Sequence, residues 1–343
     1  IKLVKEVPYT GVRGFDAVGA VLSVLGMGGL VLSILVWQEG GEFVVLLIAV
    51  GAIALGSLAR WLLRRKRENK VTLLDPDLFR KPNFTAGISA QMLQQVALGG
   101  AMIVLPLFLQ MTLEYNAMQA GLSLAPLSVT MFAAALIAGK RAGDRRPAAI
   151  IRTGFILAAV GLTIIIPLVP RVDSGWYLVV PLVITGCGLG LLVSQLNNYT
   201  LAPIEEERIS EAAGVNSAAG SFGLSFGLAM AGGLMLAALS FSFTQQTESS
   251  TVIPPAQQQQ IATALQEDAE VMSNTALAEQ ITGQPAEVEA EVVAINDSAR
   301  NRSLQVALLV PLLATLLGLM NSFRMLRLPD VKPSASLEGL DLG

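Results

Sequence analysis

Long apolar windows without a single charged residue recur along this chain. A window of about 20 apolar residues is long enough to cross the hydrocarbon of a bilayer as a helix. Eight such helices are predicted, at 16–37, 43–63, 87–111, 118–139, 148–170, 176–200, 213–242 and 303–323. The pattern therefore predicts an all-α integral membrane protein with eight transmembrane helices.

Composition agrees with this prediction and excludes several functions. The mean hydropathy is +0.60, and 53% of the 343 residues are hydrophobic while only 14% are charged. That balance is too apolar for a soluble domain. The chain has one cysteine, Cys187, and no histidine, so an internal disulfide and a Ser-His-Asp triad are excluded, and a zinc or haem site would need ligands that the chain barely has. We expect no enzyme activity, no metal and no cofactor.

The basic residues predict an orientation. If the first span leaves the cytoplasm, the inner segments 1–15, 60–86, 140–152, 201–212 and 324–343 hold 20 of the 23 Lys and Arg residues. The outer segments hold the other three, Arg171, Arg300 and Arg302. Cytoplasmic segments carry the excess of Lys and Arg in membrane proteins. Both ends of the chain are therefore predicted to be cytoplasmic, with an even number of helices.

Residues 243–300 are too polar to span a membrane and are expected to form an extracytoplasmic loop. They include four consecutive glutamines and no Lys or Arg before Arg300. Apolar residues at helical spacing predict a short amphipathic helix, at Ile261, Leu265, Met272, Leu277 and Ile281. Two interpretations stay open, a solvated cap and a cap that binds a partner.

Uncharged polar side chains lie inside two of the predicted spans. At about 100° per residue, one group falls within a single stripe of the third span: Gln91, Gln94 and Gln95, with Leu98 and Met102. A second group shares a face of the sixth span: Ser194, Asn197 and Asn198, with Gly190 and Cys187. Intramembrane polar residues usually line a pathway, although amides also hydrogen-bond between packed helices. Both groups are predicted at a similar depth, in the cytoplasmic part of their helices, where they are expected to meet.

Small residues repeat every four positions in the seventh span, as Ala219, Gly223, Gly227 and Ala231. Small residues at this spacing let two helices approach closely, so Gly223 and Gly227 are predicted packing positions, and a sliding interface during transport is the functional alternative. None of the eight spans has an Asp or Glu near its middle. A proton-coupled transporter normally needs a titratable group there.

Several segments, in order, resemble a known family. They are FDAVGAVLSVLGMGGLVLSIL, LLDPDLFRKPNFTAG, LPLFLQMTLEYNAMQAGLSLAPL, GKRAGDRRPAAIIRTG and LAPIEEERISEAAGVNSAAGSFGLSFGLAM. This arrangement is similar to the fourteen-helix drug:proton antiporters of the major facilitator superfamily (EmrB/QacA-like), C-terminal portion only. The resemblance implies two central linker helices and a basic cytoplasmic loop in 1–80, a C-terminal six-helix bundle in 81–328 that includes the loop 243–300, and a cytoplasmic tail in 329–343.

The resemblance also implies roles for particular residues. The third and sixth spans correspond to the first and fourth helices of the C-terminal bundle, which line the central cavity in this superfamily, so their amides are expected to bind substrate. GKRAGDRR is similar to a cytoplasmic loop motif of the family, and it assigns a clamp to Gly139, Asp144, Arg145 and Arg146. Asp144 follows Gly139 by five residues instead of four, and Pro147 stands where the motif has glycine. A simple positive-inside loop is the alternative.

By this resemblance, the chain is the C-terminal part of a proton-coupled exporter of small amphipathic molecules in a bacterial plasma membrane. Its partners are membrane lipid, the substrate, and protons that pass through an N-terminal bundle. The chain starts with Ile1 instead of Met, and we expect that part of a longer protein precedes it. The alternative is a membrane protein that does not transport, either a truncated product or a scaffold whose outer loop binds a partner. The residues do not identify the substrate.

Overall fold

A computed structural model describes residues 16–38, 41, 43–68, 70, 72–140, 146–267, 277 and 285–329. Within these ranges every long element is a helix: α1 (Ala17–Gln38), α2 (Val44–Arg67), α3 (Pro82–Leu107), α4 (Ala117–Lys140), α5 (Pro147–Leu168), α6 (Val179–Leu201), α7 (Ile209–Ser249), α8 (Pro255–Glu267), α10 (Ala286–Ala307) and α11 (Leu309–Arg327). The described chain contains eight helices that are long and apolar enough to cross a membrane. The predicted all-α membrane fold with eight spans is confirmed.

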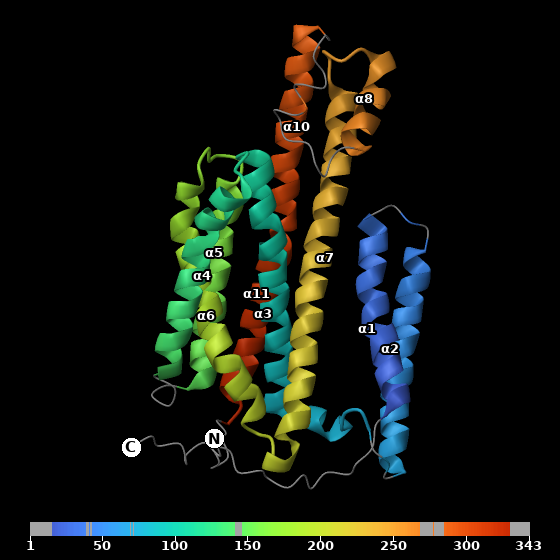
Figure 1. The fold of residues 1–343 in the computed structure, drawn as a ribbon, viewed down its shortest axis with the longest axis vertical. Helices are drawn as coiled ribbons and strands as arrows, with labels where there is room; N and C mark the ends of the chain where they lie inside the picture. Colours follow the sequence, from blue (N-terminus) through green and yellow to red (C-terminus); the bar gives the residue numbers. More distant parts are fainter. Residues whose placement is uncertain are drawn as a thin grey trace.

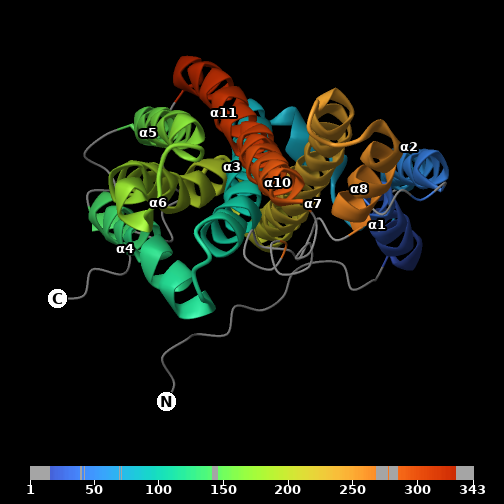
Figure 2. The same cartoon turned by 90° about the horizontal axis from the view of Figure 1, so that it is seen from above.

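Six of these spans form one bundle, which Figure 1 shows in side view and Figure 2 from above. Helix α3 lies at its centre, packed against α7 on one side and α11 on the other, while α6 packs between α4 and α5. Fully buried apolar side chains such as Phe108, Phe155 and Leu182 fill the spaces between these helices. The bundle therefore has a continuous apolar core, and any polar group inside it needs a separate explanation.

Glycines let α7 lie directly on α3. A Cβ atom at Gly223 would stand 2.5 Å from the carbonyl oxygen of Met92, and one at Gly227 would stand 2.3 Å from that of Val96. Both distances are too short for any side chain, so the two backbones touch only because these positions are glycine.

Helices α1 and α2 form a hairpin that lies beside α7, on the side away from α4, α5 and α6 (Figures 1 and 2). The two helices approach closely where Gly29 meets Gly51, with 3.2 Å between the Cβ position of Gly29 and the Cα atom of Gly51. Most of their outer side chains are large, apolar and exposed, for example Val24, Val45 and Ile53. Such surfaces are suited to lipid.

The two ends of the bundle differ in charge. One end, which we call the basic end, joins α2 to α3 and α6 to α7 and is where α11 finishes (Figure 1). The described parts of the predicted inner segments 60–86, 140–152, 201–212 and 324–343 lie there, with most of the Lys and Arg residues that the structure describes. The other end carries the α3–α4 turn, the α5–α6 turn and the elements that follow α7.

The expected loop at 243–300 is instead largely helical in its described part. Helix α7 continues seven residues beyond the predicted end at 242, and α10 begins at Ala286 instead of near 303. These extensions and α8 rise above the rest of the bundle (Figure 1). They enclose a small core of their own: Leu239, Phe243, Ile253, Leu265, Leu277, Val288, Val292, Ile295 and Ala299, with Ile261 packed against it.

This core explains why a polar sequence is helical here. The described apolar residues of this segment that form the core come mostly from α7, α8 and α10, so polar residues can remain on the outer faces of these helices. The predicted short amphipathic helix corresponds to α8 for Ile261 and Leu265, which pack as expected. Leu277 joins the same core, whereas Met272 and Ile281 lie outside the described residues.

Candidate functional site

Gln94 is the most deeply buried of the three α3 amides. Gln94 is 1% exposed, and within the described chain neither its Oε1 nor its Nε2 has a hydrogen-bond partner. The helix period places it on the same face as Gly87, whose Cβ position lies 2.3 Å from the Thr200 hydroxyl of α6. Gln94 therefore lies on the side of α3 that faces α6. A buried amide without a partner costs about 1–3 kcal/mol.

Gln91 and Gln95 lie against α7. The position of a Cβ at Gly220 is 3.4 Å from Gln91 Nε2 and 3.6 Å from Gln95 Cγ, so the glycine leaves room beside both amides. Both side chains are partly buried, and Gln95 Oε1 has no hydrogen-bond partner in the described structure. Gly220 thus borders the amides without sealing them.

Asn216 of α7 is a further amide, and it contacts the α6 group. Its Nδ2 donates a hydrogen bond to Asn197 Oδ1 on α6 at 3.1 Å, and it lies one helical turn before Gly220. Asn216 is 5% exposed, and its Oδ1 has no partner among the described residues. On α7, the partner of Asn197 thus lies one turn from the glycine that borders Gln91 and Gln95.

Sequence reasoning missed Asn216, although a signal was present. The residue stands at the head of a stripe of glycines at helical spacing, Gly220, Gly223 and Gly227. A polar residue in a stripe that packs against α3 must face the interior. We call Gln91, Gln94, Gln95, Asn197 and Asn216 the amide cluster.

Two predicted residues lie elsewhere. Ser194 Oγ accepts a hydrogen bond from Gln195 Nε2 at 3.0 Å and lies 3.7 Å from the Cβ position of Gly139 on α4. Its neighbours are therefore on α4, and the expectation that it meets the glutamines is not met. Asn198 is exposed on α6, as Asn197 is, but only Asn197 has a hydrogen bond to Asn216.

The amide cluster can bind a solute through hydrogen bonds, but it cannot perform acid–base chemistry. Its four unpartnered atoms are one donor and three acceptors: Gln94 Nε2, Gln94 Oε1, Gln95 Oε1 and Asn216 Oδ1. No member titrates near neutral pH. Such a set suits a solute that both donates and accepts hydrogen bonds.

The predicted loop motif is described only in part. Gly139 lies in the last turn of α4, while Asp144 and Arg145 lie outside the described residues. Arg146 NH2 donates to the carbonyl oxygens of Leu326 at 3.5 Å and Leu328 at 3.3 Å. These carbonyls are at the end of α11, where a cation complements the helix dipole. Arg146 thus connects the start of α5 to the end of α11.

Asp16 joins the start of α1 to α2 and to Leu73 at the basic end. Its carboxylate, 2% exposed, accepts hydrogen bonds from the N–H of Gly19 at 3.0 Å, Trp61 Nε1 at 3.0 Å and the N–H of Leu73 at 3.1 Å. Arg65 lies 3.9 Å away. Burial raises the pKa of Asp16, but these hydrogen bonds and the Arg65 charge outweigh it, so the pKa lies below its usual value.

A second group of charges joins the hairpin to α7. Asp75 pairs with Lys66 of α2 at 2.5 Å and with Arg208, next to the start of α7, at 2.7 Å. Lys66 also pairs with Asp77, and the N–H of Asp75 donates to Glu211 on α7. We call this network, with Asp16, Trp61 and Arg65, the hairpin latch.

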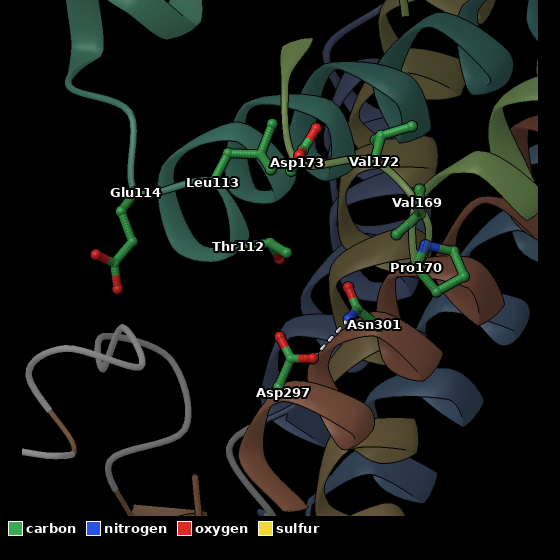
Figure 3. A pocket seen from close by; sticks show the side chains of 9 residues that line it. All are labelled: Thr112, Leu113, Glu114, Val169, Pro170, Val172, Asp173, Asp297 and Asn301. Carbon is green, nitrogen blue, oxygen red and sulfur yellow. Dashed lines mark hydrogen bonds between the residues drawn. The ribbon is translucent and has the colours of Figure 1, made fainter. Parts of the chain in front are cut away.

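A cavity of about 400 Å³ opens at the end opposite the latch (Figure 3). The α3–α4 turn contributes Glu114, the α5–α6 turn contributes Asp173, and α10 contributes Asp297 and Asn301. Asn301 Nδ2 donates to Asp297 Oδ2 at 3.2 Å, the contact drawn in Figure 3. Among the described residues, no group of three or more His, Cys, Asp or Glu side chains is placed so that it could hold a metal ion. This cavity is acidic, in contrast to the neutral amide cluster.

Comparison with known proteins identifies the family of this bundle. Residues 9–228, well over half of the chain, match the sequence model of the Major Facilitator Superfamily. The chain belongs to the major facilitator superfamily. Its helical bundle and eight apolar spans agree with that membership.

Curated relatives of this major facilitator chain are bacterial. A probable actinorhodin transporter of Streptomyces coelicolor is 26% identical over 68% of this chain and 41% of the relative. The quinolone resistance protein NorB of Staphylococcus aureus is 28% identical over 67% and 50%, and the lincomycin resistance protein LmrB of Listeria monocytogenes is 33% identical over 47% and 34%. The chain thus spans half or less of the length of these relatives. The relatives and the apolar spans are those of a bacterial inner-membrane protein.

Proposed function

We propose that this chain is the C-terminal part of a proton-coupled exporter of drugs or other small molecules, which works by alternating access. The observation that carries the proposal is the amide cluster, in which buried hydrogen-bonding atoms of α3 and α7 have no partner in the described structure, beside the Asn216–Asn197 hydrogen bond to α6. Transporter sites are formed by helices of bundles that move against each other. The names of the relatives support small-molecule substrates.

In this proposal the amides bind the substrate. Gln91, Gln94 and Gln95 act from α3, Asn197 from α6 and Asn216 from α7. Asn198, exposed on the same helix as Asn197, joins them at the edge of the path. Gln94 gains most from a ligand, because a ligand hydrogen bond removes the cost of its unpartnered amide.

Proton coupling is assigned to a bundle outside this chain. The spans of this chain have no Asp or Glu near their middle, and an intramembrane acid is the usual proton carrier of such transporters. The chain alone, reconstituted into vesicles, is therefore expected to show no substrate-dependent proton flux. Flux from the chain alone would overturn this assignment.

The test of the proposed site is ligand-induced stabilisation. A ligand that binds only the folded state raises the melting temperature. The purified chain is melted with lincomycin, a quinolone and actinorhodin, beside the variant in which Gln91, Gln95 and Asn216 are changed to alanine. We expect at least one compound to stabilise the wild type and to have little effect on the variant. Equal stabilisation of both, or of neither, would favour a protein that does not transport.

The orientation is part of the same proposal, with the basic end in the cytoplasm. A reporter fused after Leu326 is expected to be cytoplasmic, and one inserted near Gln258 in α8 is expected to be external. Opposite signals at the two positions would reverse the orientation and, with it, the side from which substrate enters the amide cluster.

A further inference from the structure

The basic run at the end of α2, Arg64-Arg65-Lys66-Arg67, divides between two faces of the helix. Arg65 and Lys66 turn inward to the hairpin latch, with side chains 23% and 33% exposed. The Arg64 side chain is 75% exposed, and Arg67 is exposed on the same side. Adjacent basic residues therefore have different environments.

The outward arginines continue an apolar column. Leu46, Ile53, Arg60 and Arg67 are spaced by seven residues and so share one face of α2. Leu46 is 58% exposed and Ile53 is 68% exposed, as expected of side chains in contact with lipid. Arg60 is exposed too, and Arg64 lies one turn beyond it. The exposed face thus changes from apolar to basic along a single line.

The length of α2 predicts that this change occurs at the depth of the lipid headgroups. From Val44 to Arg64 the helix rises about 30 Å at 1.5 Å per residue, which matches the thickness of the hydrocarbon core. Arg60 lies about 6 Å short of Arg64 along the axis and can extend its long side chain to the same level. A basic group at this level faces the phosphates of the leaflet.

We propose that Arg60, Arg64 and Arg67 form a binding site for the phosphate group of an anionic phospholipid in the leaflet at the basic end of the bundle. Basic residues directly beyond a membrane span attract anionic lipids, and the arginine fork matches phosphate oxygens. Glu68 pairs with Arg64 at 3.0 Å, but it also pairs with Lys70 at 2.7 Å. The site therefore keeps an excess of positive charge. This inference does not depend on transport.

Arg64 and Arg65 make a matched pair for the test. The purified full chain in detergent is titrated with fluorescent phosphatidylglycerol and, separately, phosphatidylcholine, and melting is followed on the same samples. We expect the wild type to prefer phosphatidylglycerol. Arg64→Gln is expected to weaken that lipid about fivefold with little change in melting temperature, and the triple change of Arg60, Arg64 and Arg67 to Gln on the order of 100-fold. Arg64→Lys, which keeps the charge, is expected to retain most of the affinity.

Arg65→Gln serves as the control, because Arg65 faces Asp16 instead of lipid. It is expected to lower the melting temperature and leave the preference for phosphatidylglycerol unchanged. The proposal is overturned if the two lipids bind the wild type equally, or if Arg64→Gln and Arg65→Gln weaken phosphatidylglycerol to the same degree. It is also overturned if inorganic phosphate competes as well as the lipid does, since the site would then recognise free phosphate.

Discussion

Polar side chains meet between helices in two regions of this chain, the amide cluster within the bundle and the hairpin latch at its basic end. In the latch, Asp16 accepts three hydrogen bonds and Asp75 pairs with two cations. In the amide cluster, Gln94 is as buried as Asp16 but neither of its amide atoms has a partner in the described structure. Burial alone therefore does not distinguish structural polar groups from functional ones. The hydrogen-bond partners do.

The comparison assigns opposite roles to the two regions. A polar group whose bonds are all made inside the protein stabilises the fold, and its removal leaves partners unsatisfied. A polar group without partners is costly to the fold and is retained for another reason, here the binding of a ligand. Removal of a satisfied latch group should consequently lower stability, whereas removal of the unpartnered Gln94 amide should raise it.

The largest expected effect is that of Asp16→Ala. The change leaves Trp61 Nε1 and the backbone N–H groups of Gly19 and Leu73 without their acceptor. Loss of one member of a buried charged network costs about 3–5 kcal/mol. We expect a large fall in melting temperature, with substrate binding retained at low temperature. A stability equal to the wild type would remove Asp16 from the latch.

Next in size is the difference between two glycines of α7, Gly220 and Gly223, which lie within one helical turn of each other. Gly223→Ala places a Cβ 2.5 Å from Met92 O and forces α3 and α7 apart, at a cost of about 1–3 kcal/mol. Gly220→Ala meets Gln91 Nε2 at 3.4 Å, beside the amides instead of against backbone. It is expected to alter ligand binding with little loss of stability. Equal melting temperatures for the two variants would contradict the distinction between packing and site.

The pH dependence of the latch is smaller. Burial raises the pKa of Asp75, but the hydrogen bonds from Lys66 and from the N–H of Asp77, with the charge of Arg208, lower it more. A carboxyl with a depressed pKa stabilises the fold fully at pH values well above its ordinary 3.8, and this contribution is lost as the pH falls through 3.8 and then through the lower folded pKa. Each unit of depression contributes about 1.4 kcal/mol. The melting temperature measured between pH 3 and pH 7 reports this loss. Asp75→Asn is expected to make the melting temperature depend less on pH. An unchanged pH dependence would assign the acid sensitivity to other carboxyls.

The smallest effect is expected for Asn216→Ala. The variant loses one hydrogen bond to Asn197, and interhelical hydrogen bonds in membranes average about 0.6 kcal/mol. In the complete transporter we expect the ratio of transport rates for two unlike substrates to change while the melting temperature falls little. A parallel loss of both rates and of stability, with an unchanged ratio, would make Asn216 a packing residue.

Much of the fold could be predicted from local pattern, because span length and hydropathy are properties of consecutive residues. The bundle helices therefore begin and end near the predicted positions, except where polar residues continue a helix. Phe243, beyond the predicted end of α7, lies in one core with Val288 and Val292 of α10, and no local pattern reveals that partner.

The candidate site divides in the same way. The shared face of Gln91, Gln94 and Gln95 follows from the helix period, but the neighbours of that face do not. Asn216 lies more than 120 residues along the chain from Gln94, and Asp16 takes partners 45 and 57 residues away. Which amides are satisfied depends on such distant contacts, so the difference between the latch and the amide cluster becomes visible only in the folded chain.

The most direct test of the account is the melting temperature of Gln94→Leu with and without a ligand that stabilises the wild type. Leucine removes the unpartnered amide and keeps an apolar side chain of similar size in the same space. We predict that the free variant melts higher than the wild type, by about 1–3 kcal/mol of stability, and that the ligand no longer raises its melting temperature. A free variant that melts lower than the wild type, together with an undiminished ligand shift, would show that Gln94 is a structural residue and would contradict the assignment of the amide cluster to substrate.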